Sequence, residues 1–132
     1  MTAVFSTPIE VRFRDLDAMG HVNNAVYATY LEQTRAIFYD QVIGQPLHQV
    51  DTVLVHLEID FKRPIEYGEN VVIEMGFERI GTSSITNSYR VRTDDEIAAT
   101  AETVQVVIDE SGSASAVPDE WIDRIETFQA TQ

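Results

Sequence analysis

Residues 15–24, DLDAMGHVNN, crowd most of the chain's candidate chemical groups into one short stretch. Its polar members are Asp15, Asp17, His21, Asn23 and Asn24. Capping a helix uses one or two such side chains, and surplus polar groups are costly to bury unless they have a task. The crowding therefore favours a site for nucleophilic or acid–base chemistry in which a carboxylate is the active group.

The stretch stands between a predicted strand and a predicted long helix. Residues 8–14 alternate apolar and polar side chains, as a half-buried strand does, and residues 23–42 carry apolar side chains at helical spacing. A helix N-terminus offers unpaired N–H groups and the positive end of its dipole, which together stabilise a developing oxyanion. We therefore expect Asp17 to face an oxyanion site, with His21 orienting Asp17 or a water.

Two other interpretations remain open for the same residues. Asp and Asn ahead of a helix are commonly caps, so the role could be wholly structural, with Asn23 or Asn24 as the cap. Asp15, Asp17 and His21 could also bind a metal, but no fourth ligand of matching character lies nearby, so we expect no metal site. We assign no role to the other histidines, His48 and His56.

Composition excludes several classes of function. The net charge is -13, from 22 acidic against 9 basic residues, so nucleic acid is a poor partner. The absence of cysteine excludes a thiolate nucleophile, a disulfide scaffold and cysteine-bound metal. No apolar run is long enough for a membrane span, and the N-terminus lacks a signal-peptide pattern. We therefore expect a cytoplasmic protein.

The acidic surface has two explanations. With a single lysine, Lys62, the chain would suit a cytoplasm of molar salt, where the Debye length falls to about 3 Å and charge repulsion is screened. A moderately acidic protein from an ordinary cell is the alternative, because net charge bears on solubility rather than on fold.

The remaining motifs narrow the chemistry to a carboxylate. Gly81-Thr82-Ser83-Ser84-Ile85 lacks the second glycine of a serine-hydrolase elbow, and the chain has no P-loop and no dinucleotide fingerprint. A carboxylate beside an oxyanion site is weak against amides. It is better suited to thioesters, because a thiol with an ordinary pKa of about 8.5 leaves readily as thiolate.

The later residues predict an antiparallel sheet. Alternating patterns indicate strands at residues 52–63, 70–80, 82–93 and 96–109, and Pro118 opens a short terminal helix. In the strand at 52–63 the pattern places Val53, Val55, Leu57, Ile59 and Phe61 on the inner face. We expect one α+β domain over residues 1–132, with five strands around one long helix. The uncovered face or edge of such a sheet favours self-association.

These residues resemble a known family. Asp15-x-Asp17-x-x-Gly20-His21-Val22-Asn23-Asn24-x-x-Tyr27, followed by Tyr30, Glu32 and Arg35, is similar to the motif of the 4-hydroxybenzoyl-CoA thioesterase family of hotdog-fold proteins, including the YbgC-like acyl-CoA thioesterases. Two later pieces, Phe61-x-x-Pro64-x-x-x-Gly68-Glu69 and Gly81-Thr82-Ser83-Ser84, also resemble turns of that family. The similarity spans nearly the whole chain.

The resemblance implies a hotdog fold, in which a five-stranded antiparallel sheet wraps around the central helix. It implies dimers whose sheets join, often assembled into tetramers, with the thioester of an acyl-CoA held at a subunit interface. It places the catalytic carboxylate on Asp17 and a polarising backbone N–H near Asn24, with His21 in support. It implies no cofactor beyond the coenzyme A of the substrate.

The expected substrate-binding residues lie mainly in the later strands. Coenzyme A carries phosphates, for which the basic candidates are Lys62, Arg63, Arg79, Arg90 and Arg92. Arg90 and Arg92 share a strand face and could grip one phosphate together, or they could pair with acidic residues of the sheet. The family resemblance adds Tyr27, Ser83 and Ser84 as substrate-binding residues.

The leading hypothesis is therefore an acyl-CoA thioesterase with Asp17 as nucleophile or general base. Alternatives are an acyl-carrier-protein thioesterase, a non-catalytic module that binds acyl-CoA, and a hotdog hydratase. Retention of Asp17 favours the enzyme over the binding module, because binding gains little from an unpaired carboxylate beside a thioester.

Overall fold

The computed structural model describes residues 3–46 and 50–132, so His48 lies outside the described residues. The strands are β1 (Val4–Ile9), β2 (Thr52–Phe61), β3 (Val71–Ile80), β4 (Ser84–Thr93) and β5 (Glu96–Val107). The α-helices are α1 (Val26–Phe38) and α2 (Asp119–Ala130). A 3₁₀ turn, η1 (Phe13–Asp15), precedes α1, and a π-helical turn, η2 (Tyr39–Ile43), follows it.

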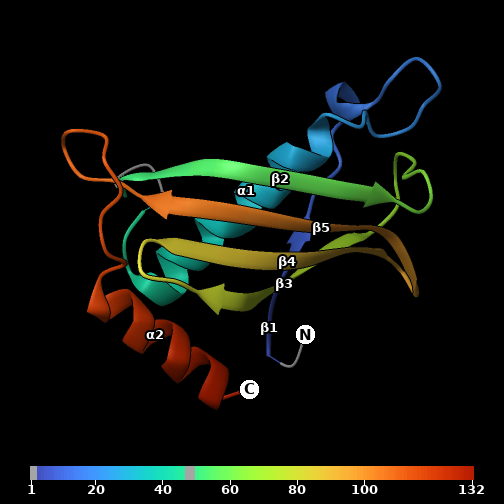
Figure 1. Cartoon of the computed structure of the whole chain (residues 1–132). Helices are drawn as coiled ribbons and strands as arrows, with labels where there is room; N and C mark the ends of the chain where they lie inside the picture. Colours follow the sequence, from blue (N-terminus) through green and yellow to red (C-terminus); the bar gives the residue numbers. More distant parts are fainter. Residues whose placement is uncertain (1–2, 47–49) are drawn as a thin grey trace.

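The strands form one antiparallel sheet with the order β1-β3-β4-β5-β2. The helix α1 lies across one face of this sheet, and α2 packs beside the end of α1 (Figure 1). The expected α+β architecture with five strands, one long helix and a terminal helix is confirmed.

The core lies between α1 and the sheet. The apolar stripe of α1 buries Tyr27, Leu31 and Phe38, each at most 2% exposed. Ile73 and Met75 of β3 are equally buried in the same core. Burial of side chains of this size stabilises the fold by roughly 1.5–3 kcal/mol each. This packing fixes the N-terminal end of α1 relative to the sheet.

The predicted helix at residues 23–42 corresponds to α1 and η2 together. The last turn widens into π geometry, and Gly44 ends it with a φ of 81°, which favours glycine. The helix begins three residues later than expected, because residues 23–25 form a turn.

The first strand departs from the prediction of residues 8–14. β1 runs from Val4 to Ile9, where Ile9 pairs with Val71, the first residue of β3. Beyond Ile9 the chain has no strand to pair with. The alternation at residues 9–13 misleads for this reason: Val11 is buried, but Phe13 lies in η1 and is 79% exposed.

β2 departs from simple alternation. The pairing with β5 shifts register between Leu54 and His56, which leaves Val55 as the extra residue of a bulge. Leu54 and Leu57 therefore lie opposite the buried residues Gln105 and Thr103. The predicted inner positions of Val53 and Val55 are wrong. On the N-terminal side of the bulge, Leu54 takes the inner position instead of Val53, and Val55 is the bulged residue itself.

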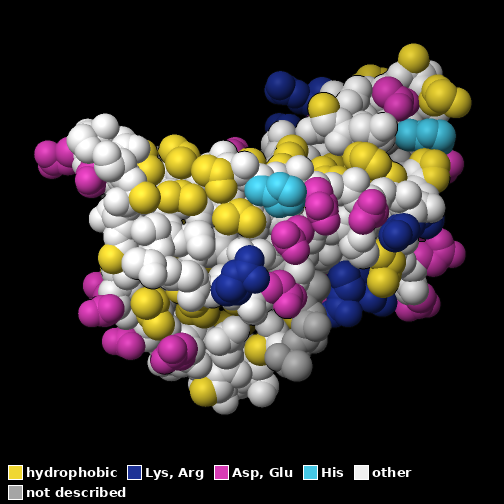
Figure 2. Space-filling model, viewed as in Figure 1, with side chains coloured by type: hydrophobic (Ala, Val, Ile, Leu, Met, Phe, Trp, Pro, Cys, Tyr) yellow, Lys and Arg dark blue, Asp and Glu magenta, His cyan; other side chains and the backbone are white. Residues whose placement is uncertain are grey.

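β2 is also an edge strand with unusual exposure of apolar side chains. Val53, Leu54, Val55, Leu57 and Phe61 are 38–57% exposed. Figure 2 shows hydrophobic side chains gathered along the edge where Figure 1 places β2. No other strand covers this edge within the described chain. An edge of this kind invites pairing with a further strand.

Candidate active site

A tight loop carries the polar motif between η1 and α1. An isolated bridge joins Leu16 to Val22, and the N–H of Asp17 donates to the carbonyl of His21 at 2.7 Å. The N–H of Gly20 donates back to the carbonyl of Asp17, and Gly20 has a φ of 79° that a residue with a side chain rarely adopts. The loop is therefore closed by its own backbone.

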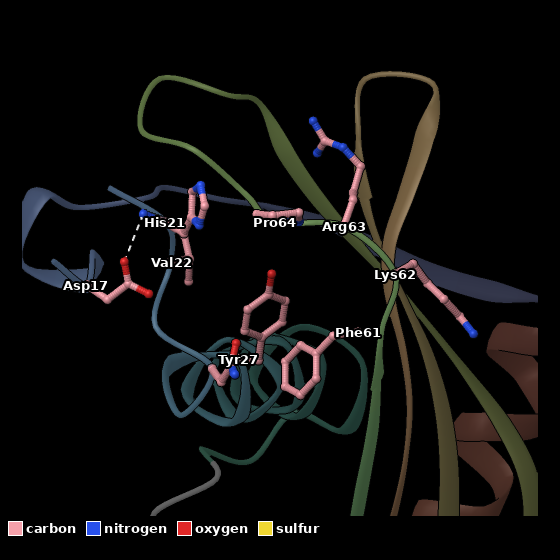
Figure 3. A pocket seen from close by; sticks show the side chains of 9 residues that line it. Asp17, His21, Val22, Tyr27, Phe61, Lys62, Arg63 and Pro64 are labelled. Atoms are coloured by element: carbon pink, nitrogen blue, oxygen red, sulfur yellow. Dashed lines mark hydrogen bonds between the residues drawn. The ribbon is translucent and has the colours of Figure 1, made fainter. Parts of the chain in front are cut away.

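The carboxylate of Asp17 is held on one side only. Its Oδ1 accepts hydrogen bonds from the N–H groups of Met19 at 2.9 Å and His21 at 3.2 Å. Within the described residues, Oδ2 has no hydrogen-bond partner. The side chain is directed toward the cavity in Figure 3. Two donors on one oxygen thus orient the carboxylate and leave the other oxygen available.

Asp15 has a different environment although it is only two residues away. It is 3% exposed, and Oδ2 accepts hydrogen bonds from the N–H of Arg12 and the hydroxyl of Tyr30. Burial by itself would raise the pKa of Asp15, but the hydrogen bonds from Arg12 and Tyr30 and the nearby guanidinium outweigh it and lower the pKa. Asp15 is therefore buried and hydrogen-bonded within the fold, which indicates a structural role.

The cavity beside Asp17 has a volume of about 350 Å³. One wall comes from the motif loop, one from the start of α1, and one from the segment that follows β2 (Figure 3). Its lining residues are Asp17, His21, Val22, Asn24, Tyr27, Phe61, Lys62, Arg63 and Pro64. The structure thus brings together the three predicted catalytic residues and three of the predicted candidates for substrate binding, Tyr27, Lys62 and Arg63.

The turn ahead of α1 leaves the backbone N–H of Asn24 without a partner among the described residues, and Asn24 lines this cavity. Its N-cap is Ala25, which makes no side-chain capping bond; the Asn23 side chain instead accepts from the N–H of Ala25 at 2.9 Å. The side chain of Asn24 likewise has no hydrogen-bond partner within the described chain. A negatively charged oxygen placed there would meet donors and the positive end of the helix dipole.

Aromatic side chains form the floor of the cavity. The rings of Tyr27 and Phe61 meet edge to face, with centroids 5.0 Å apart and planes at 90°. Burial raises the pKa of Tyr27, Arg63 opposes that shift, and Glu69 adds to it. The arrangement gives a rigid apolar floor with one phenol group.

The basic residues at the rim differ in their availability. All three guanidinium nitrogens of Arg63 are engaged: by Glu69 at 2.7 Å, by Glu96 at 2.8 Å and by the Thr93 hydroxyl at 2.7 Å. Arg63 therefore ties the segment after β2 to the β4–β5 end of the sheet. The side chain of Lys62 extends away from the cavity in Figure 3.

The other predicted substrate-binding residues lie outside the cavity. Arg90 and Arg92 of β4 both approach Glu74, at 3.0 and 3.7 Å, so they pair with an acid of the sheet. Arg79, Ser83 and Ser84 lie at the β3–β4 turn. Ser84 pairs with Val106, at the opposite end of the sheet from Phe61 and the cavity.

Three lining residues, Val22, Phe61 and Pro64, were not among the predicted site residues. Phe61 and Pro64 belong to the Phe61-x-x-Pro64 turn, and that turn was the available sequence signal. Val22 reaches the wall because the bridges Leu16–Val22 and His21–Glu66 draw the motif loop and the segment after β2 together.

Among residues 3–46 and 50–132, no three acidic or histidine side chains converge as a metal site would require. Asp15 turns toward Tyr30 and away from the cavity, so Asp15, Asp17 and His21 do not form the alternative metal cluster. None of the described helices has the length and hydropathy of a membrane span.

Comparison with known proteins identifies the family. The model of the Thioesterase-like superfamily matches residues 11–125. The chain belongs to this superfamily. A 1,4-dihydroxy-2-naphthoyl-CoA hydrolase of Nostoc punctiforme is 31% identical over 125 residues, covering 89% of this chain and 83% of that protein. A second hydrolase of the same name, from Prochlorococcus marinus, is 27% identical and covers 86% of this chain and 83% of its own length.

Solved structures of the superfamily agree with the fold. A thioesterase of Thermus thermophilus, solved with coenzyme A and Zn, superposes with a TM-score of 0.88 at 31% identity, covering 96% of this chain and 94% of that one. The five-stranded sheet around a central helix is thus the hotdog fold. The chain is an acyl-CoA thioesterase-like hydrolase.

Proposed function

We propose that this protein hydrolyses the thioester of an acyl-CoA and that Asp17 is its catalytic carboxylate. The observation that carries the proposal is the one-sided attachment of Asp17: Oδ1 is fixed by two backbone N–H groups, and Oδ2 is left without a partner beside a cavity. The cavity also includes Asn24, at the N-terminal end of α1. The carboxylate and the proposed oxyanion site therefore line one small cavity, which supports the proposal.

In the proposed reaction the thioester carbonyl oxygen points toward the backbone N–H of Asn24. Asp17 supplies the attacking oxygen, either as its own Oδ2 or as a water that it deprotonates. The tetrahedral oxyanion is stabilised at the helix end, and its collapse breaks the C–S bond. Overall, water adds OH to the acyl carbon and a proton to the sulfur, so the products are a carboxylic acid and a free thiol.

His21 acts in this proposal mainly through its backbone. Its N–H donates to Oδ1 of Asp17, and its carbonyl accepts from the N–H of Asp17. The imidazole lines the cavity without a hydrogen-bond partner among the described residues. It therefore shapes the wall, while the backbone orients the carboxylate.

An aromatic acyl group is the first substrate class to test. The perpendicular rings of Tyr27 and Phe61 offer an apolar surface of ring face and ring edge, against which a further aromatic ring can pack. Two relatives carry the name 1,4-dihydroxy-2-naphthoyl-CoA hydrolase. We therefore place 1,4-dihydroxy-2-naphthoyl-CoA first in a panel that also contains benzoyl-CoA and straight-chain acyl-CoA thioesters.

The proposed working unit is a dimer joined through the exposed edge of β2. Antiparallel pairing of β2 with a second copy would extend the sheet and cover the exposed apolar side chains. Within one chain, Thr52 lies at the end of the sheet that holds Ser84, and Phe61 lies at the end that holds the cavity. Antiparallel pairing would therefore bring the β3–β4 turn of the second copy toward the cavity of the first.

In this dimer the remaining predicted substrate-binding residues would lie near the coenzyme A moiety. Arg79, Ser83 and Ser84 of the second copy would flank the route by which the coenzyme A moiety leaves the cavity. Arg79 has no carboxylate partner among the described residues, so its charge is available for a phosphate. Arg90 and Arg92 could contribute only by sharing Glu74 with the ligand.

The test is thiol release from the acyl-CoA panel by the wild-type protein and by Asp17→Asn. Asparagine keeps an oxygen that can accept from Met19 and His21, so the loop should persist. We expect kcat to fall by about 10²–10⁴-fold, the usual range for a lost general base. Asp123→Asn, on the exposed side of α2 at the other end of α1, is the matched control and should keep full activity. Equal activity of wild type and Asp17→Asn would refute the role of Asp17.

Single-turnover hydrolysis in ¹⁸O-labelled water separates the two roles of Asp17. Attack by water places ¹⁸O in the acid formed during the first turnover. Attack by Oδ2 forms a mixed anhydride, and water that opens it at the Asp17 carboxyl carbon leaves ¹⁸O on the protein and an unlabelled Asp17 oxygen in the acid. Label on Asp17 after one turnover therefore identifies the nucleophilic route.

A further inference from the structure

Tyr27 combines burial with an unused hydroxyl group. The residue is 2% exposed, yet its hydroxyl has no hydrogen-bond partner among the described residues. Figure 3 shows this hydroxyl rising from α1 into the middle of the cavity, between the Asp17 wall and the Pro64 wall. The hydroxyl oxygen is not among the fully enclosed unpaired atoms of the described residues, so solvent reaches it through the cavity, and a bound substrate can replace that water as its hydrogen-bond partner.

Two other buried tyrosines show the usual behaviour. The hydroxyl of Tyr30 donates to Asp15 at 2.8 Å, and that of Tyr89 lies 2.6 Å from the Thr103 hydroxyl. The Tyr89 hydroxyl also accepts from Arg35 at 3.2 Å.

Tyr39, which is 3% exposed and packs on Trp121 outside the cavity, is likewise without a hydrogen-bond partner among the described residues. What distinguishes Tyr27 is that its hydroxyl enters the cavity that Asp17 also lines.

We propose that the Tyr27 hydroxyl is a second donor of the oxyanion site and hydrogen-bonds the thioester oxygen as it becomes the tetrahedral oxyanion. This proposal rests on the proposed thioester hydrolysis at Asp17. Tyr27 is in the first turn of α1, Asn24 lies in the turn just before that helix, and both line the same cavity as Asp17. The two donors therefore approach the oxygen from the same helix end, facing Asp17.

The role is that of a hydrogen-bond donor, and Tyr27 transfers no proton. Burial keeps the pKa of Tyr27 above its ordinary value of 10.0, so the phenol stays protonated beside a leaving thiol of ordinary pKa about 8.5. Contact with Phe61 holds the ring in place before substrate arrives. A donor fixed in advance stabilises the oxyanion without reorganisation, which is the condition for a large catalytic effect.

The test compares the wild type, Tyr27→Phe and Tyr39→Phe in thiol release. Tyr27→Phe removes only the hydroxyl. We expect kcat to fall by about 10²-fold, the scale of one lost oxyanion donor, with KM changed by less than about threefold. Tyr39→Phe removes the same group from a buried tyrosine that packs on Trp121 outside the cavity, and it should retain wild-type kcat.

Two non-hydrolysable acyl-CoA analogues separate this role from a structural one. A trifluoromethyl ketone can form a tetrahedral oxyanion, whereas a thioether of the same chain has no carbonyl oxygen. In Tyr27→Phe the ketone should bind at least about tenfold more weakly than to the wild type. The thioether should bind as before, which also shows that the cavity is intact.

The outcomes are distinct. If the wild type hydrolyses acyl-CoA and Tyr27→Phe keeps its kcat, or changes only KM, the proposal for Tyr27 is overturned while that for Asp17 stands. Equal weakening of ketone and thioether also overturns it, because loss of packing would explain both. A wild type without any turnover overturns the proposed function and the Tyr27 proposal together.

Discussion

The Tyr30 hydroxyl donates a 2.8 Å hydrogen bond to Oδ2 of Asp15 and ties η1 to the buried side of α1. The two carboxylates of the Asp15-x-Asp17 pair therefore have different roles. Asp15 lies inside and holds the loop to the helix, and Asp17 lies at the cavity with one oxygen available. Because Asp15 is fixed by Arg12 and Tyr30, it anchors the loop in which Asp17 lies two residues later.

Tyr30→Phe should destabilise the protein without removing a cavity residue. It takes a hydrogen bond from a buried carboxylate, which costs about 1.5–3 kcal/mol in the free energy of unfolding. Urea unfolding at pH 7 measures the loss. Thr29→Ala, an exposed change on the same helix, is the control and should alter stability by less than about 0.5 kcal/mol.

The hydrogen bond between Tyr30 and Asp15 also predicts how the stability of the protein depends on pH. Because the pKa of Asp15 is lower in the folded protein than its ordinary value of 3.8, the carboxylate contributes stability that is fully present above about pH 4. That contribution is lost as the pH falls through the folded-state pKa. Tyr30→Phe should therefore show a shallower loss of stability below pH 4 than the wild type. Parallel acid-unfolding curves for the two proteins would contradict this account.

His21→Ala should reduce kcat far less than Asp17→Asn does. The substitution keeps the backbone N–H and carbonyl that orient Asp17 and removes only the imidazole. We expect a loss of less than about tenfold in thiol release, below the 10²-fold minimum typical of a lost acid–base group. A loss as large as that of Asp17→Asn would show that the imidazole itself takes part in catalysis.

Leu57→Lys should disrupt the proposed dimer. Leu57 lies in the edge strand β2 and is 38% exposed, and a lysine there would place a charge in the apolar interface. Ile97→Lys is a matched control, because Ile97 is equally exposed but belongs to β5, which is paired on both sides. Sedimentation should show a monomer for Leu57→Lys and a dimer for Ile97→Lys. If both variants are dimers, the interface is not formed by β2.

Stability should rise with salt. At a net charge of -13, self-repulsion opposes folding, and raising KCl from 0.1 to 1 M shortens the Debye length from about 10 to about 3 Å. The melting temperature should increase over this range. The double variant Asp94→Asn, Asp95→Asn removes two negative charges from a turn, and asparagine tolerates the φ of 51° at position 94. Its salt dependence should be weaker; an unchanged slope would rule out charge repulsion as the cause.

Much of the fold follows from local patterns in the sequence. The strands β3, β4 and β5 and the helix α2 lie within a few residues of their predicted bounds, because alternation and helical spacing report which side of an element is buried. The first strand was placed wrongly. Its true extent depends on where β3 begins, and pairing between distant segments leaves no local signal.

Local alternation also failed to predict which side chains of β2 face inward. Alternation placed Val53 and Val55 inside, but a bulge at Val55 inverts the faces on its N-terminal side. A single unpaired residue is enough, because side chains in a strand have a period of two. The exposure of the apolar residues of β2 likewise depends on the order of strands in the sheet.

The sequence by itself determined the chemistry available: no thiol, no serine elbow, and a cluster of carboxylate, imidazole and carboxamides ahead of a long helix. It did not distinguish Asp15 from Asp17 by environment, nor the unpaired Tyr27 hydroxyl from the paired hydroxyl of Tyr30. Only the tertiary structure decided these, because burial and hydrogen-bond partners depend on segments that are distant in the chain and meet only on folding.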